Sequence, residues 1–147
     1  MKVYIASSWK NERYEAVCAE LRNAGHTILC WREQPFIEPN WEEWTSEQFI
    51  AAMNTDVFVA GCKKDLDLMY QADVVLLLLP CGRSAHLEMG WAVGVEWCCT
   101  VALMDSGCVS TELMYGLLDA VVADVADVVR LLAGLDPIGP HWLKVKA

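Results

Sequence analysis

A single carboxylate follows an apolar run and a glycine turn in the segment LLLLPCGRSAHLEMGWAVG, residues 76–94. This carboxylate, Glu88, lies four residues after Ser84 on a helix that the pattern predicts over 84–96. Helical side chains lean toward the N-terminus of their helix, so Glu88 is expected to lie over Ser84. If Ser84 is the N-cap, Glu88 is one residue too late to complete a capping box. The remaining structural explanation is the general preference for acids in a first turn, and we favour a functional acid.

The residues at the start of this helix are suited to binding an anion. The backbone N–H groups of Gly82 through Ala85 and the hydroxyl of Ser84 would point out of the helix N-terminus, where the helix dipole favours negative charge. Arg83 would add a positive charge. The sequence supports equally well an anion site and a purely structural explanation, in which Ser84 is a plain N-cap and Arg83 is solvated.

Two further carboxylates, Asp65 and Asp67, lie in the segment KKDLDLM. They are two residues apart on a predicted helix and therefore point to different sides, so one is expected to face solvent and the other Glu88. The residues alone do not decide which. Two carboxylates about 5 Å apart can cleave a glycosidic bond through a covalent glycosyl-enzyme intermediate.

The elements that must position these residues alternate between short apolar strands and helices. This alternation predicts an α/β fold with a mostly parallel sheet covered by helices on both faces. We expect one domain over 1–147 with an irregular tail at 134–147, and a long loop over 32–44. The expected strands are 2–6, 26–31, 73–79, 99–104 and 119–123, and the expected helices are 11–24, 45–53, 60–72, 84–96, 111–118 and 124–134.

Several details of these elements are also predicted. Gly25 is expected to stop the first helix, and Thr45 or Ser46 to cap the second. Gly90 and Gly94 are expected to let the helix over 84–96 approach the sheet closely.

In an open parallel sheet, ligands bind beyond the carboxyl ends of the strands. That rule brings Tyr4, Ser7 and Ser8, at the end of the first strand, next to the turn before Ser84. The first strand is not followed by the G-x-G-x-x-G pattern, so a dinucleotide site of the Rossmann type is not supported.

Charge and cysteine content exclude several classes of function. The net charge of −9 argues against binding a nucleic-acid polymer, although it allows a single nucleotide. The seven cysteines form no C-x-x-C pair and the three histidines lack ligand spacing to them, so neither a disulfide framework nor a metal is expected. The longest apolar run, 74–79, is too short to cross a membrane, and no signal peptide is evident. We expect a cytoplasmic protein.

Three motifs together resemble the nucleoside 2-deoxyribosyltransferase family and its relatives, the 2′-deoxynucleoside 5′-monophosphate N-glycosidases. They are KVYIASS, DLDLMYQADVVLLLLP and GRSAHLEMGWAVG, and the similarity extends over roughly residues 1–130. Short bacterial and phage members with ASSWKNERY and PCGRSAHLE are more similar still. The resemblance implies a five-stranded flavodoxin-like sheet, a homodimer or larger assembly, no cofactor, and N-glycosidic cleavage through a glycosyl-enzyme ester.

The resemblance also implies roles for individual residues. Glu88 matches the nucleophile, and Asp65 matches the aspartate that serves the leaving base or acts as the acid. Tyr4 matches the tyrosine that orients the nucleophile. The three serines Ser7, Ser8 and Ser84 match positions that hold the 5′-phosphate in the nucleotide hydrolases.

One position departs from the transferases, which place an acid six residues before the nucleophile. Here that position is Gly82, followed by Arg83 and Ser84. Loss of an acid and gain of a cation favour a phosphorylated sugar, since a carboxylate there would repel phosphate. The insertion over 31–46 is also atypical, and its Trp41 and Trp44 would either stack on a nucleobase or pack the loop.

The sequence therefore predicts cleavage of a (deoxy)nucleoside 5′-monophosphate, by hydrolysis or base transfer, with a small nucleotide or nucleoside as the partner. Two alternatives stay open. One is a nucleotide-binding or sensing protein that kept the pocket without the chemistry. The other is a hydrolase of an NAD-like nucleotide signal, which shares the same reaction at C1′.

Overall fold

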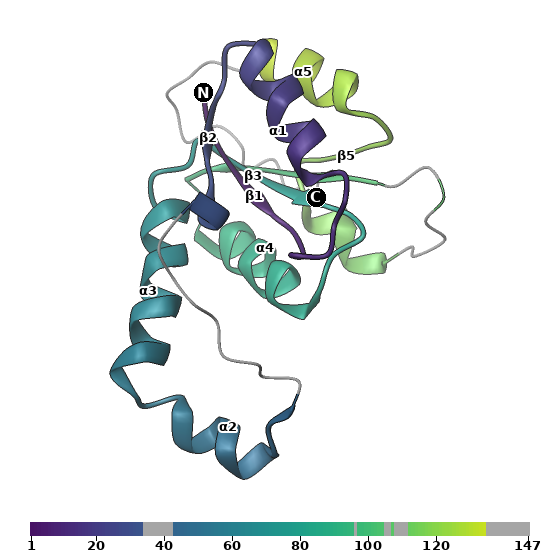
Figure 1. The fold of residues 1–147 in the computed structure, drawn as a ribbon. Helices are drawn as coiled ribbons and strands as arrows, with labels where there is room; N and C mark the ends of the chain where they lie inside the picture. Colours follow the sequence, from purple (N-terminus) through teal and green to yellow (C-terminus); the bar gives the residue numbers. More distant parts are fainter. Residues whose placement is uncertain (34–42, 96, 105–106, 108–111, 135–147) are drawn as a thin grey trace. The chain divides into compact units, whose positions relative to one another are not determined.

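The computed structural model describes residues 1–33, 43–95, 97–104, 107 and 112–134. These residues form two compact units. The first unit contains Met1–Leu29 and the described residues from Ala72 onward, and the second contains the described residues of Cys30–Gln71. Figure 1 shows the first unit as a sheet with helices around it and the second as the helices α2 and α3 with their connections. None of the described helices is long and apolar enough to cross a bilayer.

The first unit is built on a five-stranded parallel sheet with the strand order β2-β1-β3-β4-β5. This is the flavodoxin-like order, so the predicted fold class is confirmed. The predicted strands are all present, although β2 is shorter than expected. The strands are β1 (Lys2–Ala6), β2 (Thr27–Leu29), β3 (Val74–Leu78), β4 (Cys99–Leu103) and β5 (Ala120–Val122).

The two central strands β3 and β4 are buried at every position, with the sequences VVLLL and CTVAL. Continuous apolar strands of this kind fit a parallel sheet that is covered on both faces. In Figure 1, α1 (Tyr14–Asn23) and α5 (Val125–Ala133) lie on one face of the sheet, and α4 (Arg83–Val95) lies on the other. The 3₁₀-helix η3 (Leu113–Leu117) replaces the helix predicted over 111–118.

Helix α1 ends as predicted but starts later. Gly25 has φ +87°, and the N–H groups of Gly25 and His26 donate to the carbonyls of Arg22 and Leu21. This is the Schellman arrangement, in which glycine takes the left-handed conformation that other residues resist. The start is at Tyr14 rather than at Asn11, because the residues before it form a turn of their own.

Helix α4 begins at Arg83, one residue before the predicted start, so Ser84 is not its N-cap. The residue before the helix is Gly82, and glycine is an accepted N-cap because it reaches the required non-helical dihedrals easily. Glu88 therefore lies in the second turn, and the first turn contains no acid. The preference for acids in a first turn no longer explains Glu88.

The expected close approach of Gly90 and Gly94 to the sheet is also wrong. A Cβ atom at either glycine would meet no atom within 4 Å, and both residues are exposed. The face of α4 that packs on the sheet is formed by Ala85, Met89 and Ala92, at the helical spacing of i, i+4 and i+7. The two glycines lie on the opposite side of the helix.

The second unit contains η1 (Trp31–Glu33), α2 (Ser46–Ala52) and α3 (Asp56–Met69). Thr45 caps α2 and forms a capping box with Gln48, which confirms one of the two predicted caps. Helix α3 starts at Asp56 rather than at residue 60 because the Thr55 hydroxyl caps it, accepting from the Phe58 N–H. Most of the predicted loop over 32–44 lies outside the described residues.

The adjacent thiols of Cys98 and Cys99, at the start of β4, are buried beside the carboxylate of Asp119. Asp119 Oδ2 accepts hydrogen bonds from the Thr100 N–H at 2.8 Å and the Thr100 hydroxyl at 2.9 Å. Burial, reinforced by the negative charge of Asp119, raises the pKa of Cys98 to about 11 and that of Cys99 to about 12. These cysteines are neutral members of the core at physiological pH.

The raised thiol pKa values predict a loss of stability at alkaline pH. Unfolded thiols ionise near pH 9.0, whereas the folded thiols keep their protons until about pH 11 and 12, so the free energy of unfolding should fall as pH rises above 9. The expected loss is about 2 kcal/mol per thiol at about pH 10.5. Urea unfolding across this range should show a shallower decline for the Cys98→Ala/Cys99→Ala double variant, and parallel declines would contradict the assignment.

Candidate functional site

The centre of the sheet provides the place where a ligand crevice is expected. Strands β1 and β3 are parallel neighbours, and chain connections leave them in opposite directions along the sheet. Ligands of open α/β sheets bind beyond the carboxyl ends of strands at such a switch point. Two segments meet there: the β1–α1 segment, residues 7–13, and the β3–α4 turn, residues 79–82.

Ser7 and Ser8 both lie in the β1–α1 segment and are half-buried. The Ser7 hydroxyl donates to the Leu78 carbonyl at 3.0 Å, so its hydrogen is directed at the end of β3. The Ser8 hydroxyl oxygen accepts from the Lys10 N–H at 3.1 Å, which closes a tight local turn. Both serines lie in the segment that meets the β3–α4 turn, and their predicted contact with a phosphate stays a prediction.

The start of α4 is open to a ligand. Gly82, Arg83 and Ser84 are exposed, and a Cβ atom at Gly82 would meet no atom within 4 Å. The first N–H groups of a helix have no partner within the helix and carry the positive end of its dipole. The geometry therefore offers backbone donors, one hydroxyl and one guanidinium at the end of the β3–α4 turn.

His86, in the first turns of α4, links this turn to η3. Its Nδ1 lies 2.9 Å from the Gly82 carbonyl and 3.5 Å from Cys81 Sγ, and its Nε2 lies 3.0 Å from the Tyr115 hydroxyl. A carbonyl only accepts, so Nδ1 carries the hydrogen in the Gly82 contact. The rings of His86 and Tyr115 are nearly parallel, with centroids 6.1 Å apart. His86 thus contributes to the shape of the turn.

Glu88 is half-buried at the edge of the face that α4 packs on the sheet. It lies about 6 Å along the helix axis from Ser84, since each residue rises about 1.5 Å. Glu88 is the one carboxylate of α4, whose sequence is RSAHLEMGWAVGV, and a partly buried carboxylate requires polar partners. The predicted position of the Glu88 side chain over the helix start stays a prediction.

Tyr4 lies in the middle of β1 and is 1% exposed. Its register partners are Leu29 on β2 and Val75 on β3. A tyrosine so deeply buried is held in one position by packing, as an orienting role requires. Orientation of Glu88 by Tyr4 stays a prediction.

The two aspartates of α3 have different surroundings within the second unit. Asp67 forms an ion pair with Lys63 at 2.6 Å on the exposed side of the helix. The Asp65 side chain is 32% exposed and lies 3.7 Å from Lys64 Nζ. Asp65 is thus the more enclosed of the two, while its pairing with Glu88, which belongs to the first unit, stays a prediction.

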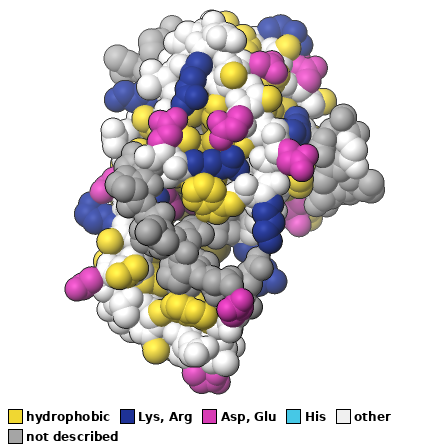
Figure 2. Space-filling model, in the orientation of Figure 1, with side chains coloured by type: hydrophobic (Ala, Val, Ile, Leu, Met, Phe, Trp, Pro, Cys, Tyr) yellow, Lys and Arg dark blue, Asp and Glu magenta, His cyan; other side chains and the backbone are white. Residues whose placement is uncertain are grey.

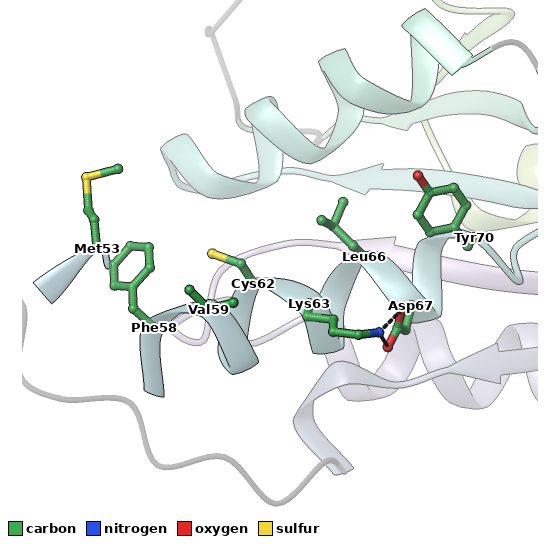
Figure 3. A pocket seen from close by; sticks show the side chains of 8 residues that line it. All are labelled: Met53, Phe58, Val59, Cys62, Lys63, Leu66, Asp67 and Tyr70. Atoms are coloured by element: carbon green, nitrogen blue, oxygen red, sulfur yellow. Dashed lines mark hydrogen bonds and ion pairs between the residues drawn. The ribbon is translucent and has the colours of Figure 1, made fainter. Parts of the chain in front are cut away.

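An open groove of about 480 Å³ follows α3 in the second unit. Figure 3 shows apolar side chains along the groove and the Lys63–Asp67 ion pair near one end. Trp44 precedes the cap of α2 and is half-buried, and Trp41 lies outside the described residues. The groove is lined by Met53, Phe58, Val59, Cys62, Lys63, Leu66, Asp67 and Tyr70.

Sequence reasoning missed two residues of the crevice, Asn11 and Arg13. Both side chains bind carbonyls of the β3–α4 turn or its borders. The sequence feature that could have indicated these two residues is the polar cluster SSWKNER directly after β1. It was overlooked because the helical pattern of the following residues was extended back to Asn11.

Comparisons with known proteins identify the fold. No protein-family model and no curated protein sequence matches the chain. The structure is similar to that of a 2-deoxyribosyltransferase from the psychrotolerant bacterium Bacillus psychrosaccharolyticus, with 21% identity and a TM-score of 0.63, over 92% of this chain and 93% of that one. It is also similar to the CMP N-glycosidase BcmB of Clostridium botulinum, with 16% identity and a TM-score of 0.55, over 90% and 99%. The chain therefore has the fold of these two proteins, as the sequence resemblance implied.

Proposed function

We propose that this protein cleaves the N-glycosidic bond of a (deoxy)nucleoside 5′-monophosphate, by hydrolysis or by transfer of the sugar to another base. The observation that carries the proposal is the half-buried Glu88 on α4, one turn inside an exposed helix N-terminus that bears Arg83 and Ser84. The fold likeness to a deoxyribosyltransferase and a CMP N-glycosidase supports the same chemistry.

The spacing of the helix start and Glu88 suits a sugar phosphate. An axial separation of about 6 Å between Ser84 and Glu88 is comparable with the span from phosphorus to C1′ in ribose 5-phosphate. A phosphate held at the N-terminus of α4 would therefore leave C1′ within reach of the Glu88 carboxylate. The same arrangement explains why a nucleophile lies in the second turn of the helix and not in the first.

The charges at the helix start favour a phosphate over a free 5′-hydroxyl. The first turn of α4 contains no acid, while Arg83 is exposed there and the helix dipole adds positive potential. The protein as a whole has a net charge of −9, so this local cation is needed to attract an anionic substrate.

The proposed reaction proceeds in two displacements. A Glu88 carboxylate oxygen forms a bond to C1′ while the C1′–N bond breaks, and the base leaves with the bonding electron pair and takes a proton. We assign delivery of that proton to Asp65 and orientation of Glu88 to Tyr4. Water, or a second base, then bonds to C1′ and loses a proton as the ester bond breaks, which restores the Glu88 carboxylate.

The remaining predicted residues have supporting roles in this proposal. Ser7, Ser8 and Gly82 are assigned to the border of the phosphate position, and the open space at Gly82 would leave room for the ligand. Trp44 and Trp41 are proposed to stack on the base. No metal or cofactor takes part in the proposed reaction.

Removal of the nucleophile tests the reaction. Glu88→Gln keeps the size of the side chain but removes its negative charge, so turnover of the best substrate should fall by about three orders of magnitude or more. Release of free base from a panel of nucleosides, nucleoside monophosphates and NAD would be followed by chromatography. Ligand binding, measured by calorimetry, should be largely retained in the variant.

The matched control is Glu20→Gln, which removes an exposed carboxylate of α1 and should leave turnover unchanged. Near-normal activity of Glu88→Gln would refute the role of Glu88. Binding of a nucleotide without base release by the wild-type protein would favour the sensor. Base release from NAD alone would favour the hydrolase of a dinucleotide signal.

Substitution of the cation at the helix start tests the choice of substrate. Arg83→Gln should raise KM for a nucleoside monophosphate by about tenfold, because a charge-assisted hydrogen bond to the phosphate is lost. KM for the corresponding nucleoside should not change. Arg22→Gln, at an exposed arginine of α1, is the control. An equal rise of KM for both substrates would contradict phosphate recognition by Arg83.

We also propose that two copies of the chain associate through the helices α2 and α3. Helix α2 has seven residues and buries none of them, and so short a helix is marginal without packing. Apolar side chains are visible on the surface of this unit in Figure 2. A self-complementary interface of two copies would cover them. Among the described residues of the unit, the exposed large apolar ones are Phe49, Ile50, Met53, Val57, Val59 and Tyr70.

Charged substitutions on these helices test self-association. The double variant Ile50→Glu/Val57→Glu places two carboxylates on the exposed apolar surface and should convert a dimer or larger assembly into a monomer, as measured by light scattering after size-exclusion chromatography. Leu113→Glu is the control, because Leu113 is equally apolar and 90% exposed but lies in η3. A monomeric wild type, or an unchanged mass of the double variant, would contradict this interface.

A further inference from the structure

Asn11 is buried, at 5% exposure, and its side-chain amide is fully engaged. The two Nδ2 hydrogens serve three acceptors, so one of them is shared: Ser7 Oγ at 3.0 Å, the Leu78 carbonyl at 3.3 Å and the Pro80 carbonyl at 3.0 Å. Oδ1 accepts from the backbone N–H of Arg13 at 2.9 Å. One side chain thus joins the β1–α1 segment to the end of β3 and to the β3–α4 turn.

Arg13 completes the set of contacts. Its Nη1 donates to the Leu79 carbonyl at 2.9 Å and to the Met104 carbonyl at 3.1 Å, and so ties the end of β3 to the end of β4. The last strand-type bond in this region runs from the Leu79 N–H to the Leu103 carbonyl at 3.1 Å. Beyond that bond the carbonyls of the turn depend on side chains for their partners.

Together, the contacts cover three successive carbonyls, from Leu78 to Pro80. Unpaired carbonyls at the border of a buried sheet would be costly, so these side chains fix the direction in which each carbonyl points. No side chain of the β3–α4 turn itself makes these contacts. The direction of the turn is therefore set by a segment about seventy residues away in the chain.

The direction of the Pro80 carbonyl determines that of the next N–H group. A trans peptide is planar, with its C=O and N–H pointing in opposite directions. Among the described residues the cis peptide is Leu79–Pro80, so the bond from Pro80 to Cys81 is trans. Because the Pro80 carbonyl points at Asn11, the Cys81 N–H points away from Asn11, out of the contact between the two segments.

We infer that Asn11 and Arg13 are positioning residues, which hold the β3–α4 turn so that its backbone N–H groups and the start of α4 are presented to the phosphate. This inference rests on the proposed function, because it assigns the support of the same phosphate site. Neither side chain contacts the substrate in this scheme. Both act through the peptide groups of residues 78–80.

Asn11→Asp separates positioning from packing. The two side chains have nearly the same shape, but a carboxylate has no N–H, and it would face the Leu78 and Pro80 carbonyls as a third acceptor. The turn is then expected to leave its native conformation. Arg13→Met removes the hydrogen bonds of the guanidinium to its two carbonyls while keeping the apolar stem. Arg13→Lys keeps a charged N–H donor group and should retain part of the phosphate affinity that Arg13→Met loses.

The primary measurement is titration with inorganic phosphate, followed by the amide NMR signals of Gly82, Arg83 and Ser84. The wild type should show saturable shifts, and Asn11→Asp and Arg13→Met should each weaken the phosphate affinity by about tenfold or more. In kinetics, the same variants should raise KM for a nucleoside monophosphate and leave KM for the nucleoside unchanged.

Thr100→Val is the matched control. Thr100 is the other buried polar residue among those the structure describes, and its contacts with Asp119 lie between β4 and β5. This substitution should lower Tm without changing phosphate affinity, so a general loss of stability is distinguished from loss of positioning.

Two outcomes would overturn the inference. If Asn11→Asp and Arg13→Met lower Tm as Thr100→Val does but bind phosphate as tightly as the wild type, the residues are structural only. If the wild type shows no phosphate-dependent shifts, the phosphate site fails as well, and the proposed function fails with it. Weaker phosphate binding by the variants would support positioning even if no base is released from any substrate.

Discussion

The structure depends on how the chain leaves its central strand. Hydrogen bonding between β3 and β4 ends at the bond from the Leu79 N–H to the Leu103 carbonyl, and the carbonyls around it still need partners in a largely apolar environment. Asn11 and Arg13 supply those partners. A turn satisfied in this way has one conformation, and that conformation determines where α4 begins and where Glu88 lies.

Much of the fold was predictable from local sequence patterns. Continuous apolar runs identified β3 and β4 as buried parallel strands, and Gly25 marked the end of α1. Predictions were less accurate where a side chain acts at a distance in sequence. The start of α1 was placed at Asn11 because helical periodicity does not reveal that this amide binds Pro80, far along the chain.

The helix of the candidate site was predictable, whereas the assembly of the site residues stays a prediction. The helix that carries Glu88 was predicted to within one residue at each end, whereas Ser84 as its N-cap lies two residues from Gly82, the residue before the observed helix, within the ordinary uncertainty of helix ends. The glycines of α4 were misjudged because small residues suggest close packing, yet here they lie on the exposed side. Contacts that join distant segments, such as those of Asn11, leave no periodic signal in a sequence.

Selection of the proposed anionic ligand by a chain with a net charge of −9 requires a local source of attraction. The selection cannot come from the overall field, which repels anions, so it must come from donors close to the ligand. Backbone N–H groups serve this purpose only if they are fixed in advance, because reorienting them during binding would consume the energy gained. A rigid turn held by Asn11 and Arg13 meets that requirement, and it lets one guanidinium, that of Arg83, act where the helix dipole already favours negative charge.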